Sequence, residues 1–300
     1  MIDGALLLDK PVGVSSNRAL QDARKLYRAK KAGHAGTLDP LASGLLVVLF
    51  GEATKFAGPL LDDDKEYVAT LKLGEKTSTG DAEGEVIEKK EVHPTEAAVA
   101  EALRRFVGES EQVPPMHSAL KRDGVPLYAL ARKGQTVERM ARRVRISALE
   151  KLRFESPLLQ LRVRCSKGTY IRTLAEDIGS ALGTCAHLAA LRRTGSGRFS
   201  VRDAITPEAL ASMPEDERAR HLLALPDLLA GLPRAELDPE QEARFRSGQA
   251  LKGFPTEALC AVFGAHGAVI GLGRADAAGA LRPLRLVAAS QTADKHRQTL

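Results

Sequence analysis

The sequence predicts a mixed α/β fold followed by a smaller domain made mainly of β-strands. Short segments that are apolar throughout, or that alternate apolar and polar residues, are typical of strands. They are interspersed with amphipathic segments whose apolar residues recur every three to four positions, as in helices. Toward the C-terminus, short strand-like segments are separated by glycine turns. With 300 residues, the chain is also longer than one compact domain usually is.

Predicted strands and helices alternate through the first two thirds of the chain. The helices begin at residues that commonly cap helix N-termini, such as Ser15 or Ser16 and Thr95. A further helix is expected from about Tyr170 to Leu182. The expected strands are 5–9, 45–50, 67–74, 143–152, 159–166 and 187–192.

Several stretches lack periodicity and are expected to be irregular. Residues 33–40 and 194–197 contain glycines, and residues 75–85 are mostly polar. Residues 222–233 are rich in leucine and proline and are expected to form a linker. Beyond them, three short strands near 261–263, 268–273 and 284–287 predict the small β domain.

Positive charge is concentrated in one segment. The chain has a formal net charge of +6, and residues 117–153 hold ten Lys or Arg against three acidic residues. This segment therefore accounts for the whole positive excess. Such a concentration is typical of phosphate contacts in nucleic-acid-binding proteins, although a solvated basic face without a ligand explains it about equally well.

Composition and motifs exclude several classes of protein. The longest strongly apolar stretch, residues 45–50, is far too short to span a bilayer, and no signal-peptide pattern opens the sequence. Cys165, Cys185 and Cys260 leave one cysteine over in any disulfide scheme, so we expect reduced thiols in a cytoplasmic protein. No Walker A, dinucleotide-binding or zinc-binding motif is present, so neither a metal nor another cofactor is expected.

The most specific pattern surrounds Asp39. Residues 33–45 read Gly-His-Ala-Gly-Thr-Leu-Asp-Pro-Leu-Ala-Ser-Gly-Leu, which places Asp39 just before a buried strand. This block resembles the catalytic motif of the standalone bacterial pseudouridine synthases that modify the T-arm of tRNA. The resemblance covers roughly residues 2–210 well and the C-terminal part loosely. Five further stretches match the same family in order, namely 8–17, 65–67, 112–121, 165–174 and 191–194.

Two positions depart from the family pattern. Ser78 stands where family members often carry Asp, and His117 stands where Tyr is common. Neither belongs to the set of catalytic residues that the resemblance implies. The departures therefore concern local contacts rather than the activity.

The resemblance implies an isomerase that converts uridine to pseudouridine. This reaction breaks the N1–C1′ bond, turns the base and rejoins it through C5, without redox chemistry. Asp39 would be the covalent catalyst, and Arg172 would pair with it and favour its charged form. Tyr67 would stack on the base and accept a proton, although an ordinary strand tyrosine fits its pattern equally well. Whether Asp39 attacks C6, attacks C1′ or promotes elimination to a glycal stays open.

The resemblance also implies residues that contact the substrate. His34 would contact the displaced nucleotide, although an isolated histidine is more often structural. Tyr170 and Leu191 would line the uracil pocket, and core packing explains them nearly as well. Lys10 would lie near the pocket, unless it is simply a solvated lysine before a proline.

The remaining expectations concern RNA binding and domain organisation. The basic segment, about residues 117–145, resembles the family's thumb-like insertion, in which Arg142, Arg143 and Arg145 would contact the RNA backbone. We expect a catalytic domain at 1–232 built on a large, mostly antiparallel sheet, a small β-barrel-like (PUA-like) RNA-binding domain at 233–288, and a disordered tail at 289–300. The partner would be the T-arm of tRNA, position 55, bound by a monomer without guide RNA. The alternatives are a noncatalytic tRNA-binding or tRNA-folding protein and a guide-RNA-dependent subunit.

Overall fold

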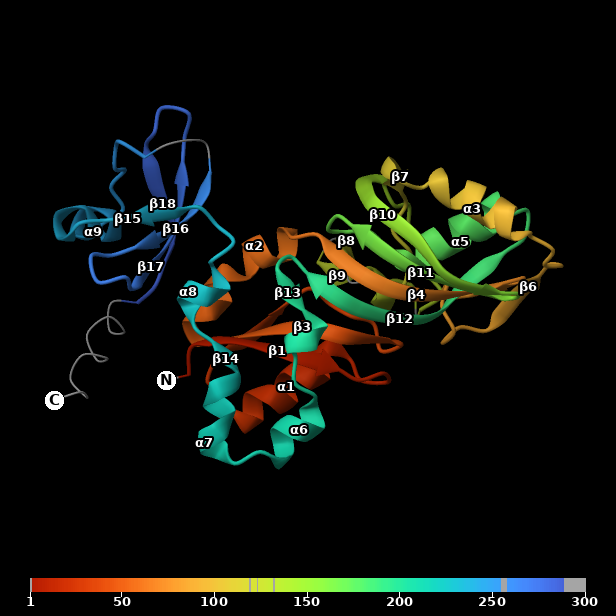
Figure 1. Ribbon diagram of the computed structural model, residues 1–300, viewed down its shortest axis with the longest axis horizontal. Coiled ribbons are helices and arrows are strands. Elements are labelled where there is room, and N and C mark those ends of the chain that lie inside the picture. The colour runs from red at the N-terminus through yellow and green to blue at the C-terminus, as the bar shows by residue number, and fades with distance from the viewer. Residues whose placement is uncertain (1, 119, 123, 132, 255–257, 289–300) are drawn as a thin grey trace.

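A large sheet forms the centre of the molecule, and a smaller C-terminal sheet lies beside one end of it (Figure 1). The computed structural model describes residues 2–118, 120–122, 124–131, 133–254 and 258–288. The predicted mixed α/β fold with a large, mostly antiparallel sheet is confirmed, as is the smaller C-terminal sheet. In the described part of the chain, no helix is both long and apolar enough to cross a membrane.

The large sheet has ten strands in the described residues. Its order is β14-β1-β3-β12-β4-β11-β10-β7, with β2 beside β3 and β13 beside β12. Among these strands, only β3 and β12 pair in parallel. The strands are β1 (Gly4–Lys10), β2 (Ala32–Ala35), β3 (Ala42–Phe50), β4 (Lys65–Leu73), β7 (Gly108–Gln112), β10 (Arg142–Glu155), β11 (Leu158–Cys165), β12 (Ala186–Ser196), β13 (Phe199–Ser200) and β14 (Leu222–Leu223).

Helices cover the large sheet in two groups. Near β1 and β3 lie α1 (Ser16–Leu26), α6 (Pro207–Ser212) and α7 (Glu215–Arg218). Over β4, β10 and β11 lie α3 (Glu96–Arg104) and α5 (Ile171–Ala181). The predicted caps are confirmed, because Ser15 accepts a hydrogen bond at the start of α1 and Thr95 does so at the start of α3. The basic insertion contains β8 (Lys121–Arg122), β9 (Val125–Pro126) and α4 (Leu127–Ala131).

Strand β3 is apolar throughout because both of its faces are buried. Leu46, Val48 and Phe50 pack against α1. The alternate residues Leu45, Val47 and Leu49 lie in a second cluster on the opposite face, together with residues of the C-terminal sheet. Period-two alternation sends neighbouring side chains to opposite faces, so a strand covered on both sides needs apolar residues at every position.

The C-terminal sheet packs against the large sheet. Phe263 and Val287 share an apolar cluster with Val47 and Phe56, and the Lys55 ammonium donates to the carbonyl of Leu286 at 2.8 Å. The sheet is formed by β15 (Arg234–Glu236), β16 (Leu259–Phe263), β17 (Val269–Ala275) and β18 (Leu281–Leu286), with α9 (Pro239–Arg246) beside it. Helix α9 was not predicted, because few of its residues are apolar.

Several predicted irregular segments are in fact strands or packed segments. Residues 33–35 belong to β2, residues 194–196 belong to β12, and residues 75–77 form β5 (Glu75–Thr77), which pairs with β6 (Val86–Lys89). The prediction of a linker at 222–233 is wrong. This segment pairs with β1, contains α8 (Leu225–Leu228) and buries Leu228 and Leu229. For residues 33–35, 194–196 and 222–233, pairing or burial against residues distant in the sequence outweighs the local glycine or proline signal. The expected tail, 289–300, lies outside the described residues.

Gly44 allows β3 and β12 to approach each other closely. Its backbone has a φ of +101°, and a Cβ atom built there would lie 2.3 Å from the carbonyl oxygen of Arg193 in β12. A side chain at this position would therefore adopt a strained backbone and also push the two strands apart.

We predict that Gly44→Ala destabilises the protein more than Gly183→Ala does. Both glycines have positive φ, but a Cβ atom at Gly183 would meet nothing within 4 Å. Gly183→Ala should therefore cost only the left-handed strain, about 1–2 kcal/mol. Gly44→Ala should add roughly 1–3 kcal/mol from overpacking. Urea unfolding of the two variants measures the difference, and equal losses would show that the close approach of β3 and β12 carries no cost.

Candidate active site

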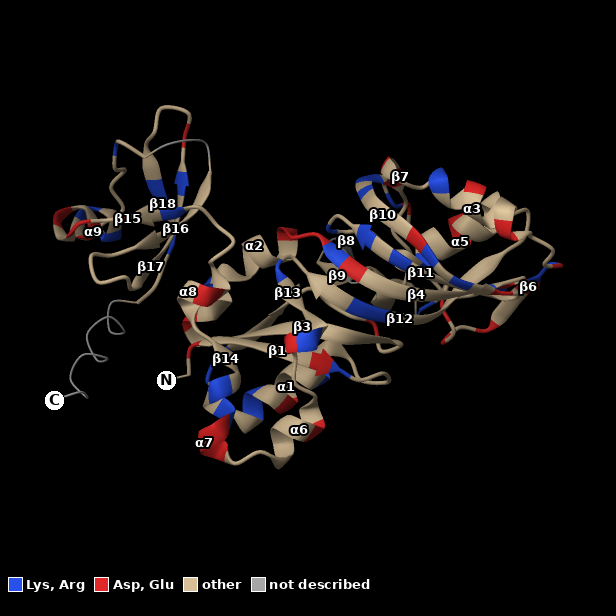
Figure 2. Ribbon diagram, in the orientation of Figure 1, with Lys and Arg blue, Asp and Glu red and all other residues tan. Residues whose placement is uncertain are grey.

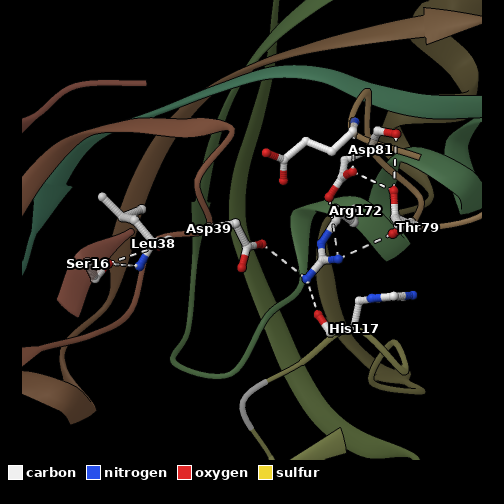
Figure 3. Close-up of polar contacts among 8 residues, drawn as sticks. Ser16, Leu38, Asp39, Thr79, Asp81, His117 and Arg172 are labelled. Carbon is white, nitrogen blue, oxygen red and sulfur yellow. Dashed lines mark hydrogen bonds and ion pairs between the residues drawn. The ribbon is translucent and has the colours of Figure 1, made fainter. Parts of the chain in front are cut away.

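Asp39 lies in the loop between β2 and β3, where backbone hydrogen bonds hold the residues on either side of it. The Ser16 hydroxyl, at the start of α1, accepts a hydrogen bond from the amide of Leu38 at 2.7 Å and donates to its carbonyl at 2.9 Å (Figure 3). The amide of Gly13 donates to the carbonyl of Pro40 at 2.8 Å. The residues on both sides of Asp39 are therefore held by the segment that begins α1.

Arg172 lies between two carboxylates at the start of α5. Its guanidinium nitrogens lie 3.0 Å from an Asp39 oxygen and 3.4 Å from an Asp81 oxygen (Figure 3). The same group donates to the carbonyls of Thr79, at 3.2 Å, and His117, at 2.5 Å. Because these contacts come from three separate segments, the orientation of Arg172 is fixed by the folded structure.

The two carboxylates differ in their exposure to solvent. The Asp81 side chain is only 4% exposed, whereas that of Asp39 is 44% exposed. Burial raises the pKa of Asp39, and Asp81 acts in the same direction, whereas the Arg172 guanidinium opposes the increase. Asp39 is therefore the carboxylate available for chemistry, and Arg172 favours its charged form.

Asp39 and Arg172 line two cavities. One cavity, of about 620 Å³, also contains Tyr67 and Leu191 in its wall. The other, of about 470 Å³, contains His34. A carboxylate at this boundary can contact one part of a nucleotide in each cavity.

The wall of the larger cavity combines aromatic and aliphatic side chains with polar and charged ones. Tyr67 comes from β4 and Leu191 from β12, and Tyr170 immediately precedes α5. The Gln112 side chain holds the backbone of Tyr170, accepting from its amide at 2.7 Å and donating to its carbonyl at 3.0 Å. The structure thus brings Asp39, Tyr67, Tyr170, Arg172 and Leu191 together around one cavity, which suits a flat, partly apolar group such as a nucleobase.

His34 lies in the smaller cavity and is held in its neutral form. Burial lowers the pKa of its imidazole, and the nearby Arg193 guanidinium lowers it further. Its Nδ1 atom is buried and has no hydrogen-bond partner among the described residues. This nitrogen is therefore an unsatisfied buried polar atom beside the smaller cavity.

Lys10 is not exposed on the wall of either cavity. Its side chain is completely buried, and its ammonium donates to the carbonyls of Pro11 at 2.8 Å and Val14 at 2.6 Å. Burial lowers the pKa of Lys10 to about 8, and Arg193 acts in the same direction, whereas Asp39 opposes it. Lys10 thus holds the turn before α1 and is not the solvated lysine of the alternative interpretation, whereas its charge acts on Asp39 beside the cavities.

The three arginines of β10 lie on two faces of the sheet. Arg142 pairs across the strands with Gln112, which holds Tyr170. Burial raises the pKa of the Tyr170 hydroxyl, and the charge of Arg142 opposes that increase. Arg143 and Arg145 are exposed on the opposite face, as the alternation with buried Val144 requires. Figure 2 shows basic residues continuing along β10 and β11. Only Arg142 therefore lies on the same face as the larger cavity.

Several site residues were missed in the sequence. Asp81 lies in a polar segment expected to be irregular, and only folding brings it to Arg172. Ser16, Gln112 and Arg193 act on the backbone or on buried groups, which leaves little trace in a single sequence. The departure at His117 has no effect on the Arg172 contact, because Arg172 binds the backbone carbonyl rather than the side chain.

Family models match nearly the whole chain. The model described as TruB family pseudouridylate synthase (N terminal domain) matches residues 24–171. The model described as tRNA pseudouridylate synthase B C-terminal domain matches residues 172–232. The model described as pseudouridine synthase II TruB, C-terminal, matches residues 233–287.

Similar proteins and structures agree with these matches. A protein named tRNA pseudouridine synthase B from Burkholderia mallei is 59% identical over 251 residues, which is 84% of this chain and 83% of that protein. A protein of the same name from Ralstonia nicotianae is 54% identical over 297 residues, covering 95% of this chain and 94% of the other. A chain in the crystal structure of a Cbf5-Nop10-Gar1 complex matches with a TM-score of 0.74 and 26% identity, covering 94% of this chain and 84% of the other. A chain in the structure of an H/ACA RNP bound to a substrate RNA containing 2′-deoxyuridine also has a TM-score of 0.74, at 25% identity, with coverage of 96% and 86%. The chain therefore belongs to the TruB family of pseudouridylate synthases.

Proposed function

We propose that the protein converts a uridine in the T-arm of tRNA, at position 55, to pseudouridine, with Asp39 as the covalent catalyst. The observation that carries this proposal is the Asp39 carboxylate, which is paired with Arg172 at 3.0 Å at the boundary of two cavities. The similar proteins named tRNA pseudouridine synthase B support tRNA as the substrate. The T-arm and position 55 come from the motif resemblance around Asp39.

The larger cavity would receive the target base after it leaves the RNA stack. Flipping a base costs about a few kcal/mol, and contacts in the pocket offset this cost. Tyr67, Tyr170 and Leu191 would contact the base, and His34 in the smaller cavity would contact the displaced nucleotide. Asp39 could then attack C6, attack C1′ or promote elimination to a glycal. In each route it must be ionised, which the Arg172 guanidinium favours.

RNA outside the active site would be bound by two further parts of the chain. These are the basic insertion, about residues 117–145, and the PUA-like domain at 233–288, with residues 1–232 as the catalytic domain. We infer a monomer that works in the cytoplasm, where its tRNA substrate is found. The insertion favours an enzyme without guide RNA, although the matched structures include an H/ACA RNP.

A noncatalytic tRNA-binding protein would not need a carboxylate held by a buried guanidinium, so that alternative is not favoured. Purified protein, free of nucleic acid, should form pseudouridine in unmodified tRNA without added RNA or cofactor. Mapping pseudouridines in tRNA from cells with and without this gene identifies the position modified. Activity that requires a co-purifying small RNA would instead indicate a guide-RNA-dependent enzyme.

We predict that Asp39→Asn abolishes turnover and changes tRNA affinity by no more than roughly a few-fold. The amide keeps the shape of the side chain but loses its charge and nucleophilicity. Asp22→Asn is a suitable control, because Asp22 is a half-buried residue of α1 that lies outside both cavities and pairs with Arg18. Pseudouridine release assays under multiple-turnover conditions measure the effect. Sustained turnover by pure Asp39→Asn protein would exclude the assigned role.

We predict that Tyr67→Phe binds tRNA normally but loses on the order of 10²-fold or more in single-turnover rate. The ring face is retained, and base–aromatic stacking, worth about 1–3 kcal/mol, needs no hydroxyl. The loss would therefore report proton transfer by the hydroxyl. Rapid-quench assays at saturating enzyme, with Tyr67→Leu as the stacking control, separate the two roles. A near-wild-type Phe variant alongside an inactive Leu variant would leave stacking as the only role.

We predict that neutralising Arg142, Arg143 and Arg145 together weakens tRNA binding and flattens its salt dependence. Each phosphate contact removed should lower the slope of log affinity against log salt by about 0.7–0.9. The geometry further predicts that Arg142→Gln accounts for most of this change. The double variant Arg143→Gln/Arg145→Gln, on the opposite face, is the matched comparison. An unchanged slope in the triple variant would mean that these arginines contact solvent rather than phosphate groups.

A further inference from the structure

Arg193 is a buried cation beside the active site that the reaction, as described so far, does not use. Its side chain is only 1% exposed, and it is the largest fully buried side chain among the described residues. Within the described part of the chain, Arg193 forms no ion pair with Asp or Glu. Burying a guanidinium without an acidic partner is costly, so its hydrogen bonds must be favourable and specific.

The partners of Arg193 lie in the Asp39 loop and in the strand that follows it. Its Nε donates to the carbonyl of Leu45, in β3, at 2.7 Å, and its Nη2 donates to the carbonyl of Gly36, in the Asp39 loop, at 3.1 Å. The guanidinium is also close enough to the Tyr67 hydroxyl for its charge to lower the pKa of that group, against the larger effect of burial. Tyr67 and Arg193 are cross-strand neighbours in the β4–β12 register, and both line the larger cavity with Asp39.

A guanidinium can only donate hydrogen bonds, so the Tyr67 oxygen would be the acceptor in any hydrogen bond between the two groups. The cross-strand arrangement in one cavity places the positive charge of Arg193 beside the phenol. Burial raises the pKa of the Tyr67 hydroxyl, and Arg193 opposes that increase. Asp39 and Cys165 also face Tyr67, and both act in the same direction as burial. Among the groups that shift this pKa, only Arg193 favours the phenolate.

We propose that Arg193 is a positioning residue for Tyr67. Its guanidinium holds the phenol oxygen of Tyr67 toward the substrate and stabilises negative charge on that oxygen. This inference rests on the proposed role of Tyr67 in proton transfer. A phenol that must take up a proton and return it benefits from a fixed donor at its oxygen, because the donor stabilises the deprotonated form without reorganising.

The other groups around Arg193 fit this role. Burial lowers the pKa values of Lys10, Lys65 and His34, and the charge of Arg193 acts in the same direction. The two lysines already donate to backbone carbonyls, Lys65 to those of Leu60, Leu61 and Asp63. They are therefore committed elsewhere, and Arg193 is the cation left to interact with Tyr67.

A double-mutant cycle distinguishes this role from a purely structural one. Arg193→Gln is introduced into the wild-type protein and into Tyr67→Phe, and single-turnover rates are measured with saturating enzyme and tRNA. We expect a loss of about tenfold or more in the wild-type background, the rate equivalent of one pKa unit, and less than about twofold in the Phe background. Between pH 7 and 10, the rise in rate with pH should move to higher pH in Arg193→Gln, because the pKa of Tyr67 increases. Arg192→Gln is the matched control, since Arg192 pairs with Asp9 on the opposite face of the sheet.

Equal losses in both backgrounds, or an unshifted pH profile, would overturn the proposal and leave Arg193 as a support for Leu45 and Gly36 only. If Arg193→Gln does not fold, the same cycle is run with Arg193→Lys, which keeps the charge but lacks the planar donor group. Failure of the proposed function would give different experimental results from failure of this inference. Wild-type protein that forms no pseudouridine would reject the activity, and a fully active Tyr67→Phe variant would reject the proton-transfer role together with this inference.

Discussion

The parallel pairing of β3 with β12 is the constraint on which the site depends. In the described sheet, it is the contact that joins β14, β1 and β3 to β12, β4, β11, β10 and β7. The Asp39 loop belongs to the first group of strands, whereas Tyr67 and Leu191 belong to the second. Because Gly44 has no side chain, the two groups approach closely enough for Arg193 in β12 to reach the carbonyl of Leu45 in β3. Without that approach, the carboxylate and the base-binding wall would lie on separate units.

Buried cations are the second feature that shapes the site. Lys10, Lys65, Arg172 and Arg193 are all buried, and of these only Arg172 forms ion pairs among the described residues. The other three donate hydrogen bonds to backbone carbonyl groups. Carbonyl dipoles offset part of the desolvation cost but do not cancel the charge. The interior below the cavity is therefore positive, which favours an ionised Asp39 and an anionic nucleotide above it.

The local features of the fold could be predicted from the sequence, whereas the non-local ones could not. Alternation in residues 67–74 and the caps at Ser15 and Thr95 depend on neighbouring residues, and these predictions were correct. The extension of β12 to Ser196 and the pairing of β2 with β3 depend on strands far away in the sequence, and glycine in these segments suggested loops instead. At the site, the motif around Asp39 was specific enough to identify the family. Asp81 and Arg193 were not found, because their importance arises from distances that a single sequence does not encode.

The distribution of polar groups explains how such a site can permit a base to turn. In the proposed reaction the sugar must stay in place while the detached base rotates and presents C5 instead of N1. Dispersion and stacking contacts are weakly directional, so walls made of Tyr67, Tyr170 and Leu191 can hold a flat ring in more than one orientation. Hydrogen bonds are strongly directional, and those of Asp39 and Arg172 lie at the boundary between the cavities, where they would hold the sugar. A cavity lined with fixed donors and acceptors on every side would bind one orientation of the base tightly and oppose its rotation. The separation of apolar walls from a charged boundary is therefore what this isomerisation requires of the protein.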